Sequence, residues 1–172
     1  MRRKRDAMNL QSIREGIYFG AVMSGDELIS ISLVSPEEEY YVFSSEFNQE
    51  YLPHVLLNLE ANLPTKNGSL DCAHPNVKSR LDIMMEMELF IQRNKDRTLW
   101  GYNLAYDQVR LDKPVSNLLF DNDPHDLSTL ELLLGNPEFP KKPDIYSAIK
   151  KARFRRSLGL WLADRMEETV QR

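Results

Sequence analysis

Five basic residues lie close together near the C-terminal end of the chain and could bind phosphate groups. Lysine and arginine side chains neutralise phosphate charge, so such a cluster predicts local binding even though the formal net charge of the chain is −4. The alternative interpretation is a solvated helix face. The cluster consists of Lys150, Lys151, Arg153, Arg155 and Arg156.

Several tyrosines could complement this charge, because exposed aromatic rings stack on the bases of single-stranded nucleic acid. Each of these rings, taken singly, could equally pack within the core or against a sheet. The tyrosines concerned are Tyr18, Tyr102, Tyr106 and Tyr146.

One aspartate lies just beyond an expected strand. Residues 98–102 (TLWGY) predict a short apolar strand, Asn103 follows it, and a helix is expected over about residues 106–111. Asp107 lies in that helix and offers one oxygen ligand of the kind that magnesium-type cations prefer. A single carboxylate is too few ligands for such a cation, so Asp107 would need partners.

The remaining reactive residue types form no catalytic pattern. His54, His74 and His125 are scattered without metal-ligand spacing, and the single Cys72 excludes an internal disulfide and a cysteine metal cluster. A lone cysteine suits a reducing cytoplasm, where we expect this protein. We expect neither a signal peptide nor a membrane span, because no apolar run is long enough.

The N-terminal half predicts an antiparallel meander that would position these groups. Residues 16–23 are apolar and aromatic, residues 27–34 (ELISISLV) alternate in polarity, and residues 39–43 (EYYVF) are rich in β-branched and aromatic side chains. Turn-forming residues separate the three segments.

Helices are expected in the rest of the chain. One covers part of residues 50–59, before a loop through residues 62–75, and another begins after Ser79, which forms a capping box with Asp82. We expect Pro114 to end or interrupt the 106–111 helix. Asp126 is expected to cap a further helix that stops at Gly135. The inward residues of these helices are predicted to be Ile83, Met87, Phe90, Ile91, Leu127, Leu130, Leu133 and Leu134.

A long final helix over residues 144–168 completes the prediction, with buried positions at Ile145, Ile149, Ala152, Trp161 and Leu162. Strands in a meander followed by alternating helices and a strand predict an α/β fold, in which helices flank a mixed sheet. This is the element order of the ribonuclease H-like architecture. The length predicts one domain over residues 16–172, with residues 1–15 as a tail or short amphipathic lead-in.

In this order and spacing the chain resembles the DEDDh 3′–5′ exoribonucleases, in their compact bacterial and phage branch, which are related to the proofreading exonucleases. The resemblance covers roughly residues 16–162. Local blocks carry it: LISIS followed by EYYVFSSEF, VKSRLDI, LWGYNLAYDQVRL, HDLSTLELLLGNPEFP and YSAIKKARFRR. The last block resembles the family's His-Asn-Ala-Leu-x-Asp-Ala-Arg helix.

The resemblance implies a two-metal phosphodiester hydrolase with four carboxylates and a histidine base, yet this chain departs from it almost everywhere. Only Asp107 matches a metal ligand, and it is the only metal ligand expected. Tyr146 stands at the position of the base and Lys151 at that of the last aspartate. The first-strand Asp-x-Glu pair falls on Gly16 and Tyr18, or alternatively on Gly20 and Val22.

Three functions follow from these departures. The first is a catalytically inactive exonuclease-like protein that binds single-stranded nucleic acid or its 3′ ends, RNA rather than DNA, without a cofactor. Its binding residues would be the five-residue basic cluster with Asn103 and Tyr106. The second is a structural subunit that binds a protein partner or forms a homo-oligomer. The third is an exoribonuclease using magnesium or manganese, with carboxylates displaced to Asp26, Glu27, Asp144 or a partner subunit.

Overall fold

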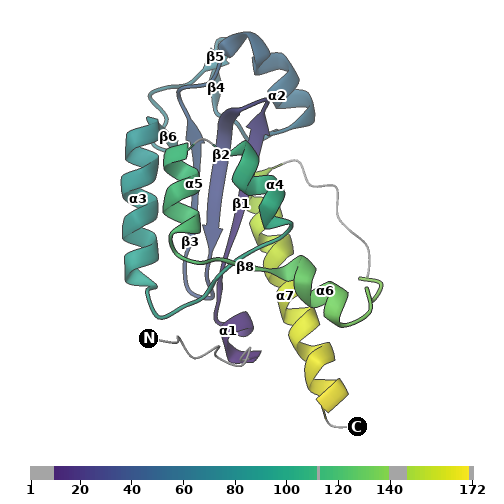
Figure 1. The fold of residues 1–172 in the computed structure, drawn as a ribbon. Coiled ribbons are helices and arrows are strands. Elements are labelled where there is room, and N and C mark those ends of the chain that lie inside the picture. The colour runs from purple at the N-terminus through teal and green to yellow at the C-terminus, as the bar shows by residue number, and fades with distance from the viewer. Residues whose placement is uncertain (1–9, 112, 140–146, 171–172) are drawn as a thin grey trace.

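A mixed sheet forms the centre of the molecule in the computed structural model, which describes residues 10–111, 113–139 and 147–170 (Figure 1). Among the described residues its six strands follow the order β6-β3-β2-β1-β7-β8. The strands are β1 (Ile17–Ser24), β2 (Glu27–Val34), β3 (Glu39–Ser44), β6 (Val77–Lys78), β7 (Leu99–Gly101) and β8 (His125–Asp126).

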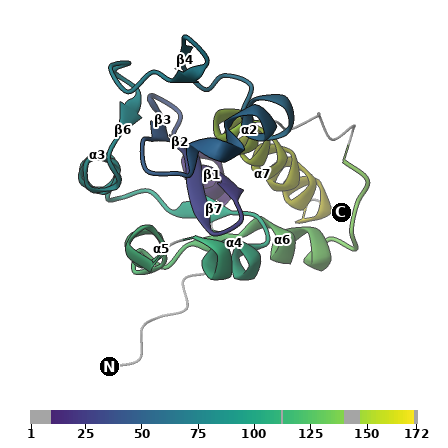
Figure 2. The ribbon, with the colours of Figure 1, turned by 90° about the horizontal axis from the view of Figure 1, so that it is seen from above.

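Strand direction confirms the predicted fold class. β1, β2 and β3 form the expected antiparallel meander, whereas β7 pairs in parallel with β1, and β8 in parallel with β7. Helices cover both faces of this sheet (Figure 2). The molecule therefore has a ribonuclease H-like α/β architecture, as the element order predicted.

The two faces of the sheet carry different helices. α3 (Arg80–Arg93) and α5 (Lys113–Phe120) pack on one face, and α7 (Ala148–Val170) crosses the other (Figures 1 and 2). Smaller helices complete the ends of the fold. These are α1 (Leu10–Arg14), the 3₁₀ turn η1 (Gln49–Tyr51), α2 (Leu52–Asn58), α4 (Leu104–Arg110) and α6 (Leu127–Leu133).

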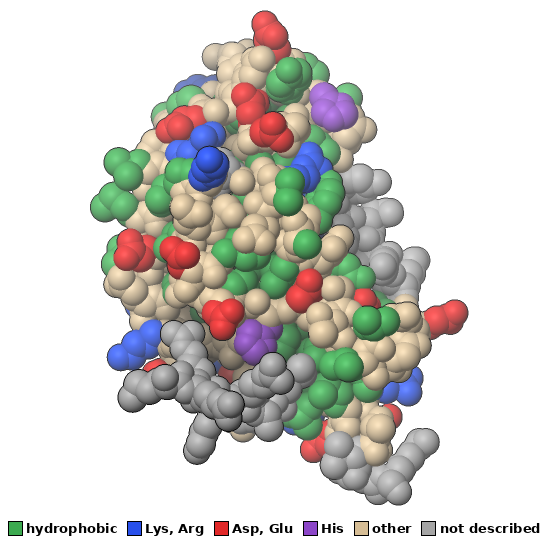
Figure 3. Space-filling model, viewed as in Figure 1, with side chains coloured by type: hydrophobic (Ala, Val, Ile, Leu, Met, Phe, Trp, Pro, Cys, Tyr) green, Lys and Arg blue, Asp and Glu red, His purple; other side chains and the backbone are tan. Residues whose placement is uncertain are grey.

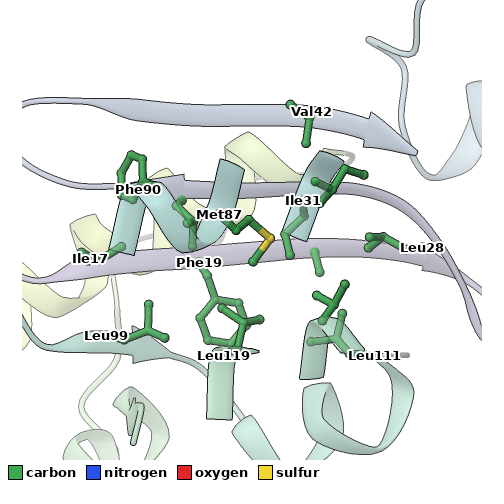
Figure 4. Packing of buried hydrophobic residues seen from close by; sticks show 14 residues of the cluster. Ile17, Phe19, Leu28, Ile31, Val42, Met87, Phe90, Leu99, Leu111 and Leu119 are labelled. Carbon is green, nitrogen blue, oxygen red and sulfur yellow. The ribbon is translucent and has the colours of Figure 1, made fainter. Parts of the chain in front are cut away.

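Alternation along β1 separates the two layers, because successive side chains of a strand point to opposite faces. Ile17 and Phe19 enter the cluster with α3 and α5, where Figure 4 shows Phe19 beside Leu119. Tyr18 and Val22 belong to the clusters on the α7 side. The sheet face that α7 covers is therefore lined by the even-numbered residues of β1.

Two predicted caps are present. The Ser79 side chain accepts a hydrogen bond from the Asp82 backbone N–H at the start of α3, and the Asp126 carboxylate accepts one from the Ser128 backbone N–H at the start of α6. Gly135 follows α6 with φ of +78°, a left-handed conformation that terminates helices without a steric penalty. Local sequence chemistry thus located these helix ends correctly.

Other local predictions were wrong. Leu133 is 69% exposed rather than inward, because α6 ends there. α7 begins at Ala148, not at residue 144, and Trp161 is only partly buried. Pro114 lies in the first turn of α5, a helix that was missed, because a proline is tolerated where backbone N–H groups lack partners. The short strands β6 and β8 were also missed, as was a hairpin of β4 (Thr65–Lys66) and β5 (Ser69–Leu70).

Part of the N-terminal segment that the sequence predicted as a tail or lead-in packs against the domain. Ile13 of α1 is fully buried and packs in a cluster with residues of α7, and Arg14 forms ion pairs with Asp164 and Glu167. No helix in the described ranges combines the length and apolar character that crossing a membrane requires.

Candidate functional site

Asp107 and the basic helix α7 meet on the α7 side of the sheet. Asp107 of α4 forms an ion pair of 3.0 Å with Arg155 of α7, and only 14% and 11% of the two side chains are exposed. Arg155 also donates to the backbone carbonyls of Phe19, at 2.8 Å, and Tyr102, at 3.2 Å. One guanidinium thus joins β1, the end of β7, and α4.

Lys151 lies one helical turn before Arg155 and faces the same strand. Its Nζ donates to the carbonyl oxygen of Ala21 on β1 at 2.9 Å. Burial lowers the pKa of the Lys151 ammonium, and the positive charge of Arg155 lowers it further, whereas Asp107 partly opposes both effects. The positively charged Lys151 side chain therefore lies near Asp107, where a metal-binding site would need a further carboxylate.

A small cavity of about 170 Å³ opens beside these groups. Lys151, Asp107 and Arg110 contribute its charged lining, with Tyr106 at its edge. The Arg110 guanidinium stacks 5.1 Å from the Tyr106 ring centre and donates to the tyrosine hydroxyl and to the Gly25 carbonyl. Tyr106 lines the cavity and remains 55% exposed.

The first strand approaches α7 at Gly20. A Cβ atom at Gly20 would lie 2.4 Å from the Ala148 carbonyl oxygen and 2.8 Å from Lys151 Cβ. Val22, two residues on, lines the cavity. Tyr18 instead lies against Gly159, two turns further along α7. Of the two candidate pairs for the Asp-x-Glu positions, Gly20 and Val22 are therefore the pair beside Lys151.

Only part of the proposed basic cluster reaches this cavity. Lys150 is exposed, and Arg153 pairs with Glu39 of β3 through two hydrogen bonds of 2.9 and 2.6 Å. Arg156 lines a different hollow, beside the turn between β2 and β3. Lys151 and Arg155 thus lie on one side of α7 and Arg153 and Arg156 on another, which periodicity alone did not resolve.

The other proposed contact residues have different surroundings. Asn103 is exposed and adopts a left-handed conformation with φ of +57°, and its backbone N–H donates to Asp126 at 2.9 Å. Tyr18 is fully buried and donates to the Ile13 carbonyl, so its ring cannot stack on a base. Tyr102 is partly buried, and Tyr146 lies outside the described residues.

Displaced carboxylates do not gather around Asp107 in the described part of the chain, where no group of three or more potential metal ligands is found. Asp26 is exposed in the turn after β1. Glu27 accepts a hydrogen bond from the Asn48 backbone N–H at 2.9 Å. Asp144, the third candidate, lies outside the described residues.

A buried carboxylate that the sequence analysis missed lies at the start of α7. Glu60 is fully buried and accepts hydrogen bonds from the Ser30 hydroxyl at 2.5 Å, the Tyr41 hydroxyl at 2.8 Å and the Ala148 backbone N–H at 3.0 Å. One carboxylate oxygen therefore joins the start of α7 to β2, and the other binds β3. Serines at alternate positions of an otherwise apolar β2 were the available signal for a polar partner.

Comparison with protein-family models and with curated proteins finds no match for this chain. The family resemblance therefore rests on the residues and on the fold, and its functional meaning is a proposal.

Proposed function

We propose that this protein is a catalytically inactive exonuclease-like protein that binds single-stranded nucleic acid, RNA in preference to DNA, in the cytoplasm. The observation that supports this most directly is the placement of Lys151 and Arg155 against β1, with Arg155 paired to Asp107. The cavity beside them is positively charged and has an exposed tyrosine at its mouth.

The described residues do not fit a pair of divalent cations. The Asp107 carboxylate is engaged by Arg155, and the Lys151 ammonium would repel a metal ion at that place. Gly20 leaves no room for a carboxylate unless α7 moves away from β1. As part of the same proposal, we therefore infer that the protein does not hydrolyse nucleic acid by a metal-dependent mechanism.

The same groups suit a phosphate. Three positive side chains, Lys151, Arg155 and Arg110, lie near two carboxylates, Asp107 and the buried Glu60, so the local charge is positive although the whole chain is acidic. Lysine binds phosphate oxygens as a point charge. A base next to that phosphate could stack on Tyr106, which is a sequence-tolerant contact.

The test is a titration of fluorescently labelled single-stranded RNA and DNA dodecamers at several salt concentrations, read by anisotropy and by electrophoresis for trimming. We expect binding without trimming, with or without magnesium. Lys151→Ala should weaken binding and reduce the salt slope by about 0.7, the value for one phosphate contact on a single strand.

Lys95→Ala is the matched control, because Lys95 is exposed just after α3 and should leave binding unchanged. Magnesium-dependent trimming that requires Asp107 would overturn the inactive assignment. Absence of binding to either strand at low salt would overturn the nucleic-acid assignment.

A second candidate is a structural role through protein contacts, favoured by the outer face of α3. Leu81, Met85 and Leu89, spaced four residues apart, are 66%, 55% and 52% exposed. Figure 3 shows hydrophobic side chains at the surface over this helix, at the left edge of the view. If this role holds, light scattering should show an oligomer that Met85→Glu dissociates, while nucleic-acid binding is absent.

A further inference from the structure

The outer edge of β3 is unpaired over most of its length. β6 pairs with this strand only at Phe43 and Ser44. Residues 39–42 pair with β2 on their inner side, and no further strand of the described sheet lies beside them. An unpaired edge presents a row of backbone donors and acceptors that can accept another strand.

Two hydrogen bonds determine which backbone groups point outward. The Phe43 N–H donates to Asn76 beside β6, which places Phe43 among the residues whose backbone faces away from β2. At the other end, the Ser35 N–H donates to the Glu38 carbonyl, which makes that pair inward-facing. Because backbone direction alternates along an antiparallel strand, the N–H and C=O groups of Glu39 and Tyr41 face outward.

These groups lie at a groove rather than on an open surface. The groove has a volume of about 550 Å³ and has Glu39–Val42 along one side. Lys78 and Glu86, joined at 2.6 Å, line it next to α3, and Ile149 and Arg153 line it from α7. Side chains of an inserted strand would alternate between these two helices.

A second hollow of about 370 Å³ lies beside the start of β3 and shares Glu39 and Arg153 with the groove. Arg156 lines this second hollow, and its Nε is buried without a hydrogen-bond partner among the described residues. Arg153, by contrast, is already engaged by Glu39. Glu37 and Glu38 also line this hollow, but they are already paired with Arg97 and Arg93. A ligand carboxylate entering here would therefore pair with the Arg156 guanidinium.

We propose that the β3 edge binds an extended peptide segment of a partner protein as an added strand, with an acidic side chain of that segment at Arg156. The outward backbone of Glu39 and Tyr41 supplies the pairing, and Arg156 supplies the selectivity.

The probes are two capped hexapeptides, Ac-EVTVTV-NH2 and Ac-TVTVTE-NH2, which present the acid to Arg156 from a parallel and from an antiparallel strand. Backbone amide exchange is followed by NMR on the full chain. With one peptide about tenfold above its dissociation constant, exchange at Tyr41 should slow about tenfold, because about one molecule in ten then keeps a free edge. The Tyr40 amide, already in the ladder with β2, should not change.

Two controls separate the contribution of backbone pairing from that of Arg156. The same peptide with alternate amide nitrogens methylated keeps its side chains and should lose the protection, and Arg156→Gln should abolish the preference for glutamate over lysine in the peptide. Equal protection by the methylated peptide, or no effect of either peptide at millimolar concentration, would overturn the proposal. Protection of Tyr41 without peptide that grows with protein concentration would assign the edge to a second copy instead.

Discussion

Asp107 and Arg155 form a pair that is nearly buried, so its removal should cost more stability than the loss of an exposed pair. Asp107→Ala leaves a buried guanidinium with two carbonyl partners only. We expect a loss of about 2–3 kcal/mol in the free energy of unfolding. Urea denaturation measures this difference.

The control is Glu39→Gln, which removes the charge from an ion pair whose two side chains are 40% and 59% exposed. Such exposed pairs contribute about 0–1 kcal/mol. Similar losses of unfolding free energy in the two variants would show that the buried Asp107–Arg155 pair stabilises the fold no more than an exposed pair does.

Lys151 should make nucleic-acid binding sensitive to alkaline pH. Burial lowers its pKa below the ordinary value of 10.5, so the ammonium loses its proton earlier than an exposed lysine does. Binding should therefore weaken as pH rises through that lowered pKa, while the folded state gains stability up to the unfolded pKa because it has already released the proton.

Anisotropy titrations between neutral pH and about pH 10 measure this dependence. Lys151→Gln serves as the comparison, because it should bind more weakly with a flatter pH profile over the same range. Identical profiles for the two proteins would contradict the role of Lys151.

At the scale of elements, the contact of α7 with β1 depends on Gly20. An added methyl group would lie 2.4 Å from the Ala148 carbonyl oxygen, so Gly20→Ala must displace the helix. We expect a loss of about 3 kcal/mol in urea denaturation and shifted α7 amide resonances.

Gly25→Ala is the informative comparison, because that residue has open space and only its φ of +60° disfavours alanine. It should cost about 1 kcal/mol through the backbone and leave the α7 resonances in place. An unshifted α7 in Gly20→Ala would contradict the close approach.

At the scale of the whole molecule, divalent cations should not stabilise this protein. A ligand that binds only the folded state raises the melting temperature as its concentration exceeds the dissociation constant. Because the positive side chains of Lys151 and Arg155 already lie beside Asp107, we expect no metal ion to bind there. The melting temperature should therefore change by less than about 1 °C in millimolar manganese or in EDTA.

Differential scanning fluorimetry provides this measurement, with Asp107→Asn as the matched variant. A manganese-dependent rise that disappears in Asp107→Asn would contradict the expectation and would locate a metal at Asp107.

Local sequence chemistry determined much of this protein. The meander followed from alternating polarity and turn residues, and the caps at Ser79 and Asp126 followed from hydrogen bonds within a few residues of each helix start. The short strands β6 and β8 could not be predicted in this way, because each contains two residues and exists only through pairing with a longer neighbour.

The sequence already showed almost no carboxylates at the positions where the exonuclease resemblance implies them, whereas the contacts that residues at those positions make were decided by tertiary structure. The engagement of Arg155 with three separate elements, and of Glu60 with the start of α7, joins residues that are far apart in the chain. The division of the basic cluster between the cavity and the β3 groove likewise depends on how α7 is rotated against the sheet. Sequence patterns determine which residues share a helix face, whereas packing determines which neighbours that face meets.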